Sequence, residues 1–320
     1  MWNLLRRGAR KQAGAAKPAN AATQILRKVA GTDQFTQSDF KAFIGSLKEA
    51  GIAFHLIDAF VDHYGAYYEA NPNKAKRADS KFGHLKFDIH GDIARPVEMA
   101  RILHALDVRG MFLAMHRHAL NTAWYGTEKM WDALKEIRGL GHEVGLHVDP
   151  FHLITTHNDL YDGLGAALED FGKRGFAIRA ITLHGDSRPH IKARKLQAND
   201  FFADGFRKSK WDGVPPEGQE MLAEHVGRYK HRRLFRKCGI EYVADGNLVR
   251  NGELIVDAPI MYLSDNHRCM RIGNIDARIV KGRILESPDT FAITREFTAE
   301  AAKLLAKRPF LALFHPQWYR

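Results

Sequence analysis

The chain reads LKFDIHGDIARPVEMARILHALDVRGMFLAM over residues 85–115, and this stretch decides the fold. A short apolar run leads into Asp88 and His90, a helical pattern of apolar residues follows, and a second apolar run begins after Gly110. Short apolar runs between turn residues are typical of buried strands, and apolar residues three and four positions apart are typical of helices. The stretch therefore predicts two parallel strands joined by a helix.

The same alternation of strand and helix continues towards the C-terminus. The predicted strands are at residues 85–89, 110–115, 143–147, 177–183, 240–244, 259–263 and 309–314. The predicted helices between them include 96–106, 128–138 and 159–172. Pro96 stands at the first position of one helix, and Thr127 and Gly139 mark the start and the end of another. This alternation predicts an α/β fold with a mainly parallel sheet.

Sequence patterns divide the chain into three parts. They are a basic flexible tail at 1–31, a helical extension and linker at 32–80, and a barrel at 81–320. The extension has apolar residues at helical spacing in 38–50 and again in 53–70. Within the barrel, residues 185–236 are longer and more polar than a simple crossover requires, so we expect an irregular excursion over the active face.

The net charge of +11 comes mainly from the basic tail. Seven basic residues and no acidic one lie in residues 1–31, which leaves 41 basic residues against 37 acidic ones in the rest of the chain. A nucleic-acid-binding domain would interleave basic and aromatic residues, and this pattern is absent beyond residue 31. We therefore expect no nucleic-acid partner. The tail is typical of a solvated segment, and a transit peptide or a peripheral membrane contact stays open as an alternative.

The remaining composition indicates an ordinary globular protein. Hydrophobic residues make up 45% of the chain and charged residues 27%. No run approaches the ~20 apolar residues of a membrane helix, and the start lacks the apolar core of a secretory signal. The two cysteines, Cys238 and Cys269, are too few for a disulfide framework. We therefore expect a cytoplasmic protein.

Histidine and aspartate residues gather where the predicted strands end. They are Asp88, His90 and Asp92 in the first strand and just after it, His147 and Asp149 at the third, His184 at the fourth, Asp265 at the sixth and His315 at the last. In a parallel α/β barrel, functional side chains lie at this end of the strands. Imidazoles and carboxylates bind Zn²⁺ and related ions, and three protein ligands with one water make a hydrolytic site. The pattern predicts a metal-dependent hydrolase.

Several other enzyme classes lack their motifs in this chain. His142 and His147 in HEVGLH are five positions apart, whereas a zincin helix needs four, and Val144 and Gly145 favour a strand. There is no Gly-x-Ser-x-Gly elbow, no P-loop and no Gly-x-Gly-x-x-Gly after a strand. These absences argue against a zincin, a serine hydrolase, an NTPase and a dinucleotide-binding enzyme.

The stretch 85–115, followed after a helix by LGHEVGLHVDP at 140–150, resembles the polysaccharide deacetylases of carbohydrate esterase family four. Members of this family have a strand ending in Phe-Asp-x-(Asp)-Gly, a helix, a strand, a second helix and then Gly-His-Glu-Ile-Gly-x-His. The resemblance is specific over residues 84–150. It extends more distantly to ITLHG, YLSDN and FHPQWY at 181–185, 262–266 and 314–319.

The resemblance implies a distorted (β/α)7 barrel that binds one divalent metal ion. Zn²⁺ is expected, with Co²⁺, Mn²⁺ or Ni²⁺ as alternatives. By position, Asp88 corresponds to the catalytic aspartate of the family, His90 to the metal-binding aspartate and His147 to the first metal-binding histidine. His315 corresponds to the histidine that protonates the leaving amine.

Two features depart from the family pattern. The second metal-binding histidine falls on Phe151, with His152 next to it, and no Arg-x-Pro-Tyr segment is found. The predicted site consists of Asp88, His315 and His184 as catalytic residues, His90, His147 and His152 as metal ligands, and Asp92, Asp149, Asp265 and Trp318 as substrate-binding or ligand-orienting residues. Among the last group, Asp92 could instead cap a helix, and Asp149 and Asp265 could be turn residues.

These residues predict a hydrolase that removes an N-acetyl or other acyl group from a sugar or glycan precursor in surface polysaccharide biosynthesis. Asp88 would take the proton of the attacking water, and His315 or His184 would protonate the departing nitrogen. Pro316 and Trp318 would shape an apolar wall beside the sugar. Because the ligand pattern departs from the family, the alternative is a carbohydrate-binding barrel that has lost the metal and the activity.

Overall fold

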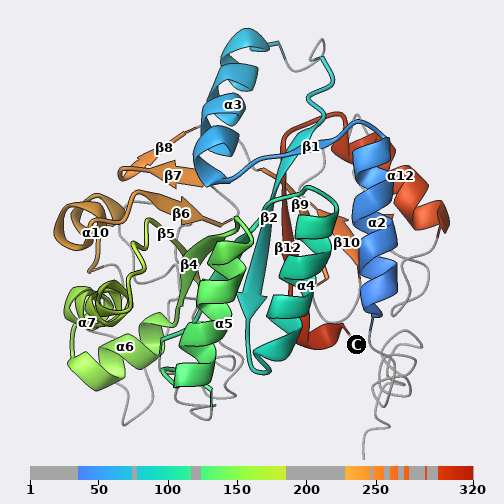
Figure 1. Cartoon of the computed structure of the whole chain (residues 1–320). Coiled ribbons are helices and arrows are strands. Elements are labelled where there is room, and N and C mark those ends of the chain that lie inside the picture. The colour runs from blue at the N-terminus through green and yellow to red at the C-terminus, as the bar shows by residue number, and fades with distance from the viewer. Residues whose placement is uncertain are drawn as a thin grey trace, which may run out of the picture. The chain divides into compact units, whose positions relative to one another are not determined.

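A curled sheet is the centre of the structure (Figure 1). The computed structural model describes residues 35–73, 78–116, 124–184, 228–245, 248–255, 260–265, 270–273, 285–286 and 295–319. The central strands are β2 (Phe82–Ile89), β3 (Met111–Ala114), β4 (Glu143–Val148), β5 (Ala180–Leu183), β6 (Tyr242–Ala244), β9 (Met261–Ser264) and β12 (Phe310–Phe314). They pair in parallel in the order β9-β12-β2-β3-β4-β5-β6.

These seven strands correspond one by one to the predicted strands. The α/β class and the distorted (β/α)7 barrel of mainly parallel strands are therefore confirmed. Within the described residues β6 and β9 do not pair, so the curled sheet is open between them. Antiparallel strands extend both edges, with β10 (Arg271–Gly273) and β11 (Leu285–Glu286) beyond β9, and β7 (Leu248–Arg250) and β8 (Glu253–Leu254) beyond β6. A short strand, β1 (Ala53–Phe54), pairs with the start of β2.

The described helices are α2 (Gln37–Glu49), α3 (Ile57–Ala70), α4 (Ala94–Ala105), α5 (Glu128–Gly139), α6 (Pro150–His157), α7 (Leu160–Lys173), α10 (His231–Cys238) and α12 (Arg295–Leu305), followed near the C-terminus by the 3-10 turn η4 (Pro316–Trp318). The apolar spacing predicts α2, α3, α4, α5 and α7. It does not predict α6, α10 or α12, and α10 begins within the stretch 185–236 that the sequence predicts to be irregular. Thr127 caps α5 as expected, because its hydroxyl accepts the N–H of Met130. α4 begins at Ala94, two residues before the predicted start. Pro96 still lies in the first turn, where its missing N–H costs no helical hydrogen bond.

Two apolar cores fix the position of the site. The first lies between the sheet and the surrounding helices, and includes Phe87 of β2 packed edge-to-face against Phe40 of α2. The second fills the inside of the curled sheet, where Leu113 and Leu311 from the strands belong to one cluster with Phe60 of α3. In Figure 1, α3 lies at the end of the sheet from which the arrow of β2 starts. The amino end of the barrel is therefore closed by apolar packing, and the carboxyl end is left for polar side chains.

The helical extension packs directly on the barrel. α2 contacts α12 and α4, Phe35 pairs with Tyr319, and all of these belong to one compact unit, Gln34–Arg320. The basic tail at 1–31 lies outside the described residues, as does the expected excursion of 185–236 up to residue 227. Among the helices that the structure describes, none is both long and apolar enough to cross a membrane.

Candidate metal and catalytic site

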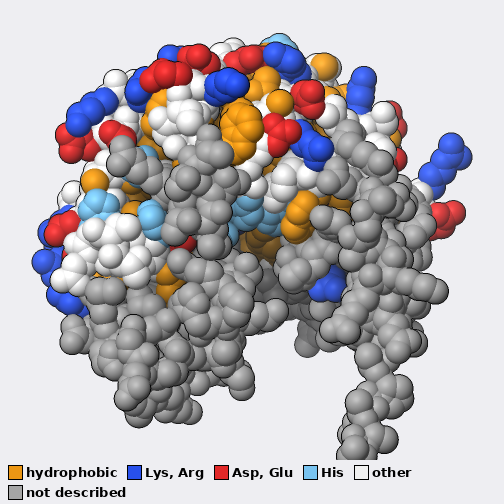
Figure 2. Space-filling view, turned by 90° about the horizontal axis from the view of Figure 1, so that it is seen from below, with side chains coloured by type: hydrophobic (Ala, Val, Ile, Leu, Met, Phe, Trp, Pro, Cys, Tyr) orange, Lys and Arg blue, Asp and Glu red, His pale blue; other side chains and the backbone are white. Residues whose placement is uncertain are grey.

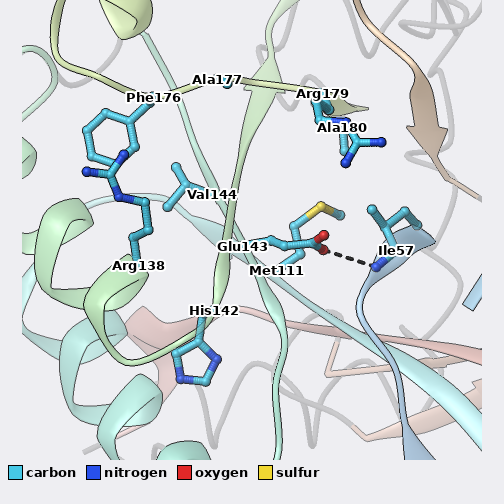
Figure 3. A pocket seen from close by; sticks show the side chains of 10 residues that line it. All are labelled: Ile57, Met111, Arg138, His142, Glu143, Val144, Phe176, Ala177, Arg179 and Ala180. Atoms are coloured by element: carbon cyan, nitrogen blue, oxygen red, sulfur yellow. Dashed lines mark hydrogen bonds between the residues drawn. The ribbon is translucent and has the colours of Figure 1, made fainter. Parts of the chain in front are cut away.

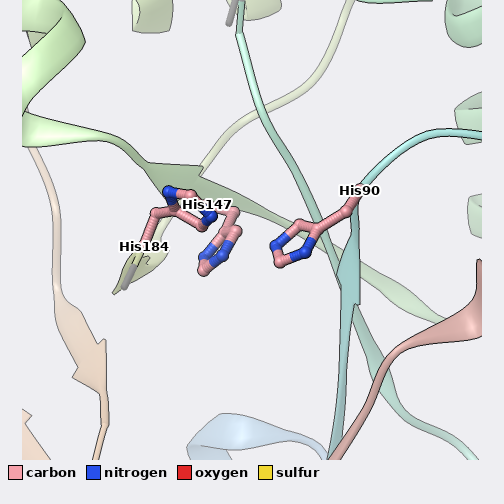
Figure 4. Close-up of side chains that lie close together, drawn as sticks. All are labelled: His90, His147 and His184. Carbon is pink, nitrogen blue, oxygen red and sulfur yellow. The ribbon is translucent and has the colours of Figure 1, made fainter. Parts of the chain in front are cut away.

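Three histidines meet at the carboxyl end of the sheet (Figure 4). His90 directly follows β2, His147 lies in β4 and His184 directly follows β5. One ring nitrogen of each lies within 4.8 Å of those of the other two. The rings of His90 and His147 stack with their centroids 4.9 Å apart, and the centroid of His184 is 5.1 Å from that of His147. Three imidazoles at this spacing can provide the protein ligands of one divalent ion.

The strand register brings these histidines together. His147 of β4 lies opposite Thr182 of β5, and His184 follows two residues later, on the same face of the chain as Thr182. At the end of β2 the chain turns at Gly91, whose φ of +132° is in the region that favours glycine. Figure 2 views the molecule from this end and shows histidine side chains gathered near the middle of the face.

A second group overlaps the first at His90. Ligand atoms of Asp88, His90 and His315 also lie within 4.8 Å of one another. Asp88 is only 4% exposed, and its Oδ2 atom is 3.5 Å from Nε2 of His147. The two groups therefore form one continuous cluster of four histidines and one aspartate.

His147 is held in the form that suits a metal ligand. Its Nδ1 atom is 2.7 Å from the hydroxyl of the buried Thr182, and burial, followed by the neighbouring His90 and His184, lowers the pKa of His147 well below its usual value. The ring is therefore neutral near pH 7. With its proton on Nδ1, it donates to Thr182 and keeps the lone pair of Nε2 for the centre of the cluster.

The buried Asp88 is suited to proton transfer. Burial raises the pKa of its carboxyl group, and the positive charges of Lys86 and His315 oppose that shift without cancelling it. A carboxylate with a raised pKa is a stronger base than an exposed one. Within the described part of the chain, neither Oδ1 of Asp88 nor Nε2 of His147 has a hydrogen-bond partner, although both are buried. Buried polar atoms without partners are costly, so this donor set fits a bound cation.

His315 is paired with a carboxylate from the neighbouring strand end. Its Nδ1 atom is 2.6 Å from Oδ1 of Asp265, and its backbone N–H donates to Oδ2 of Asp265 at 2.7 Å. Burial lowers the pKa of His315, but the charge and hydrogen bond of the fully buried Asp265 outweigh this and raise the pKa overall. The ring of Trp318 stacks on the imidazole of His315, with the ring centroids 4.2 Å apart. His315 is therefore held as a proton donor beside an aromatic wall.

Five of the predicted site residues lie outside both groups of ligand atoms. Asp265 and Trp318 contact His315, and the other three are Asp149, His152 and Asp92. Asp149 is the N-cap of α6, because its Oδ1 accepts the backbone N–H of His152 at 3.1 Å. His152 lines a small pocket with His147 but does not belong to either group of ligand atoms. Asp92 is exposed and accepts the N–H of Ala94 at the start of α4. Asp149 therefore caps a helix, and Asp92 makes a turn contact two residues along the chain, before α4.

Three residues outside the predicted site support the cluster. Thr182 orients His147, and Lys86 and Asp245 form an ion pair of 3.4 Å beneath the site. Lys86 carried a signal, since a lysine within the apolar run LKFDI is unusual for a buried strand. Thr182 and Asp245 carried none, because a threonine in a strand and an aspartate after one are common.

A separate cavity of about 240 Å³ lies at the opposite end of the sheet (Figure 3). Its lining includes Glu143 at the start of β4, and Oε2 of Glu143 accepts the N–H of Ile57 at 3.0 Å. The N-cap residue of α3, Leu56, makes no side-chain capping bond, so Glu143 takes over that role from another strand. Burial raises the pKa of Glu143 to about 7. The glutamate of the GHEVG motif therefore anchors a helix at the closed end and is not part of the candidate site.

Comparisons with known proteins give matches among solved structures alone. No family model matches the chain, and no curated protein matches it. One similar structure is the Xyl-CE4 domain of a multidomain xylanase from the hindgut metagenome of Trinervitermes trinervoides, with 13% identity and a TM-score of 0.24 over 32% of this chain and 47% of that one. The chain thus spans about half the length of this match.

Two further solved structures are similar to larger parts of the chain. The deacetylase PplD of Streptococcus pyogenes, in complex with acetate, has 15% identity and a TM-score of 0.33 over 54% of this chain and 75% of that one. The catalytic domain of a peptidoglycan N-acetylglucosamine deacetylase from Eubacterium rectale has 12% identity and a TM-score of 0.37 over 76% of this chain and 79% of that one. The first of these three structures is described as a CE4 domain, and the other two are described as deacetylases.

Proposed function

We propose that this chain is a metal-dependent hydrolase that removes an N-acetyl group from a sugar or glycan precursor. One observation carries the proposal. Three histidines, a buried aspartate and a histidine paired with a second aspartate converge at the carboxyl end of one parallel barrel. A metal ligand set, a base and an acid in one place are the components that amide hydrolysis requires.

We assign the ligand role to His90, His147 and His184. This set replaces His152 with His184, because His184 has a ring nitrogen within 4.8 Å of the other two donors and His152 does not belong to the group. All-nitrogen ligand sets are compatible with Zn²⁺, Co²⁺ and Ni²⁺. A divalent ion bound here would supply an activated water and polarise the acetyl carbonyl.

The protein's own groups would move the protons. Asp88 lies beside His147, at 3.5 Å, and would accept the proton of the attacking water. His315, held by Asp265, would donate a proton to the departing nitrogen. Trp318, stacked on His315, would give a sugar ring an apolar surface to lie against.

The substrate class belongs to the same proposal. We take the substrate to be an acetylated precursor of a surface glycan, processed in the cytoplasm, as the sequence analysis suggests. The carbohydrate-binding alternative would keep the barrel and the aromatic wall without turnover. Both versions predict sugar binding, and only the hydrolase predicts release of acetate.

The test is an assay of acetate release by metal-stripped protein and by protein reloaded with Zn²⁺ or Co²⁺. The substrates are N-acetylated sugar nucleotides and short N-acetylated glycans. We expect release in the loaded protein alone, and its loss in His147→Ala. The matched control is His104→Ala, which removes an exposed histidine from α4. Bound sugar with bound metal but no acetate would favour the carbohydrate-binding alternative, and a parent protein that retains no metal would overturn the proposal.

A further inference from the structure

A carboxylate at the end of β6 joins the two strands that carry His90 and His184. We propose that Asp245 is a positioning residue for the metal site: it fixes the end of β5 so that His184 meets His90 and His147. Lys86 of β2 holds Asp245 in place for this purpose. The inference rests on the proposed function, because it gives His184 the role of a metal ligand.

Lys86 binds the end of β6 from strand β2 across the barrel. This lysine is only 1% exposed and lies in β2, two residues before Asp88 and on the same face of the strand. Its ammonium group donates to the carbonyl oxygen of Ala244 at 2.9 Å and to Oδ1 of Asp245 at 3.4 Å. A buried ammonium is costly unless it is paired, so the charge of Lys86 keeps the carboxylate of Asp245 turned into the barrel.

Asp245 also binds the backbone of β5. Its pairing with β6 ends at Ile181 and Val243, so the strands separate just before the site. The N–H of Leu183 lies beyond this last pair and donates to Oδ2 of Asp245 at 3.1 Å. A side chain thus satisfies a backbone donor where the strand ladder has stopped. One carboxylate therefore binds Lys86 through one oxygen and β5 through the other.

Leu183, which Asp245 holds, lies directly before His184 in the chain. The N–H of His184 donates in the opposite direction, to the carbonyl oxygen of Val148 in β4, at 2.6 Å. The last two residues of this strand end are therefore held from both neighbouring strands. Removing Asp245 would free one side of that attachment and allow the imidazole of His184 to move away from the other two donors. Metal affinity is sensitive to small displacements of a ligand.

If Asp245 has only a structural role, its removal should still lower the stability of the protein, but its effect on metal affinity should differ. If Asp245 acts through His184, its removal should have no effect on metal affinity once His184 is gone. If it only stabilises the barrel, its removal should lower affinity with or without His184. A double-mutant cycle separates these cases.

The experiment measures Zn²⁺ affinity of full-length protein by competition with a chelator. The variants are Asp245→Ala, Asp245→Asn, His184→Ala and the double variant Asp245→Ala/His184→Ala. We expect Asp245→Ala to weaken binding by about 10–100-fold, as for other groups that orient a metal ligand. Asp245→Asn keeps an oxygen acceptor for the N–H of Leu183, so its affinity should fall between those of Asp245→Ala and the parent.

The matched control is Glu241→Ala. Glu241 also links β5 to β6, through Arg179, but it does so at the amino end of these strands. Its loss should leave Zn²⁺ affinity unchanged. Absorption spectra of the Co²⁺-loaded proteins give a second readout, and we expect an altered spectrum in Asp245→Ala and the parent spectrum in Glu241→Ala.

Each outcome decides between the proposals. Equal losses of affinity from Asp245→Ala in the parent and in His184→Ala would overturn the positioning role while the proposed function stands. Unchanged Zn²⁺ affinity in Asp245→Ala would also overturn the positioning role and leave the proposed function standing. A parent protein without measurable Zn²⁺ affinity would overturn the proposed function and this inference together. If Asp245→Ala does not fold, Asp245→Asn replaces it in the double-mutant cycle, both alone and combined with His184→Ala.

Discussion

His315 and Asp265 are joined by two hydrogen bonds to one carboxylate. Nδ1 of His315 lies 2.6 Å from Oδ1, and the backbone N–H of His315 donates to Oδ2 at 2.7 Å. The first bond orients the ring and raises the pKa of His315, and the second fixes the end of β12 on the end of β9. Because the same carboxylate does both, one side chain determines the position of the His315 imidazole and raises its pKa.

Replacing Asp265 with Asn should shift the pH profile of deacetylation. Asp265 raises the pKa of His315, so its removal should lower that pKa. A general acid is active while protonated, and activity is lost as the pH rises through its pKa. The alkaline limb of kcat/KM should therefore move to lower pH in Asp265→Asn, with metal content unchanged. A limb that stays in place would show that another group provides the proton.

Removing the imidazole of His315 should slow turnover without removing the metal. A positioned general acid typically contributes about 10²–10⁴-fold, so kcat of His315→Ala should fall by that order. The alkaline limb should disappear as well. Metal analysis of the dialysed variant serves as the control. If His315→Ala keeps full turnover, His315 is not the general acid.

The choice of the third ligand can be tested with a matched pair of histidine variants. His184 has a ring nitrogen within 4.8 Å of those of His90 and His147, whereas His152 is outside the group. We expect His184→Ala to lose Zn²⁺ during dialysis and His152→Ala to retain it. Metal bound per chain and the rise in Tm on adding Zn²⁺ are the measurements. Loss of metal in His152→Ala alone would restore the ligand set expected from the sequence.

The buried His84 should make the fold sensitive to acid. Burial lowers its pKa to about 4, and its Nδ1 donates to the carbonyl oxygen of His55 at 2.9 Å. In the unfolded chain, His84 takes up a proton near its usual pKa of 6.5, whereas in the folded protein it stays neutral down to about 4. The stability contributed by neutral His84 is therefore lost as the pH falls from 6.5 towards 4. The slope would approach ~1.4 kcal/mol per pH unit from this group. Urea unfolding of the parent and of His84→Asn, whose amide can donate in the same place, should differ in this slope.

Glu143 should have the opposite dependence. Its pKa is raised to about 7 in the folded protein, so the folded state favours the protonated form. Stability from this group is present at low pH and lost as the pH rises from its ordinary pKa towards 7. Glu143→Gln, which can still accept the N–H of Ile57, should therefore be more stable than the parent at pH 8 and lose this advantage at pH 5. Equal stability at both pH values would contradict the raised pKa.

The seven strands and most of the helices can be predicted from the amino-acid sequence. Apolar runs such as GMFLAM have no polar face, so they had to be strands buried on both sides, and the helical patterns between them required a parallel sheet. The histidines and aspartates at the strand ends followed from the same register, because a parallel barrel gathers the carboxyl ends of its strands on one side. Asp88, His90 and His147 could be named on this basis.

The tertiary structure decided which of these side chains meet. His152 is five residues from His147 along the chain, but α6 begins between them, and His152 does not belong to the group of ligand atoms that includes His147. His184 is far from His147 in sequence, but β5 is the neighbour of β4. The support from Lys86 and Asp245 is also invisible in sequence, since it joins positions 159 residues apart. Local patterns fix what each strand is, whereas ligand sets depend on distances between strands, which only the packed sheet determines.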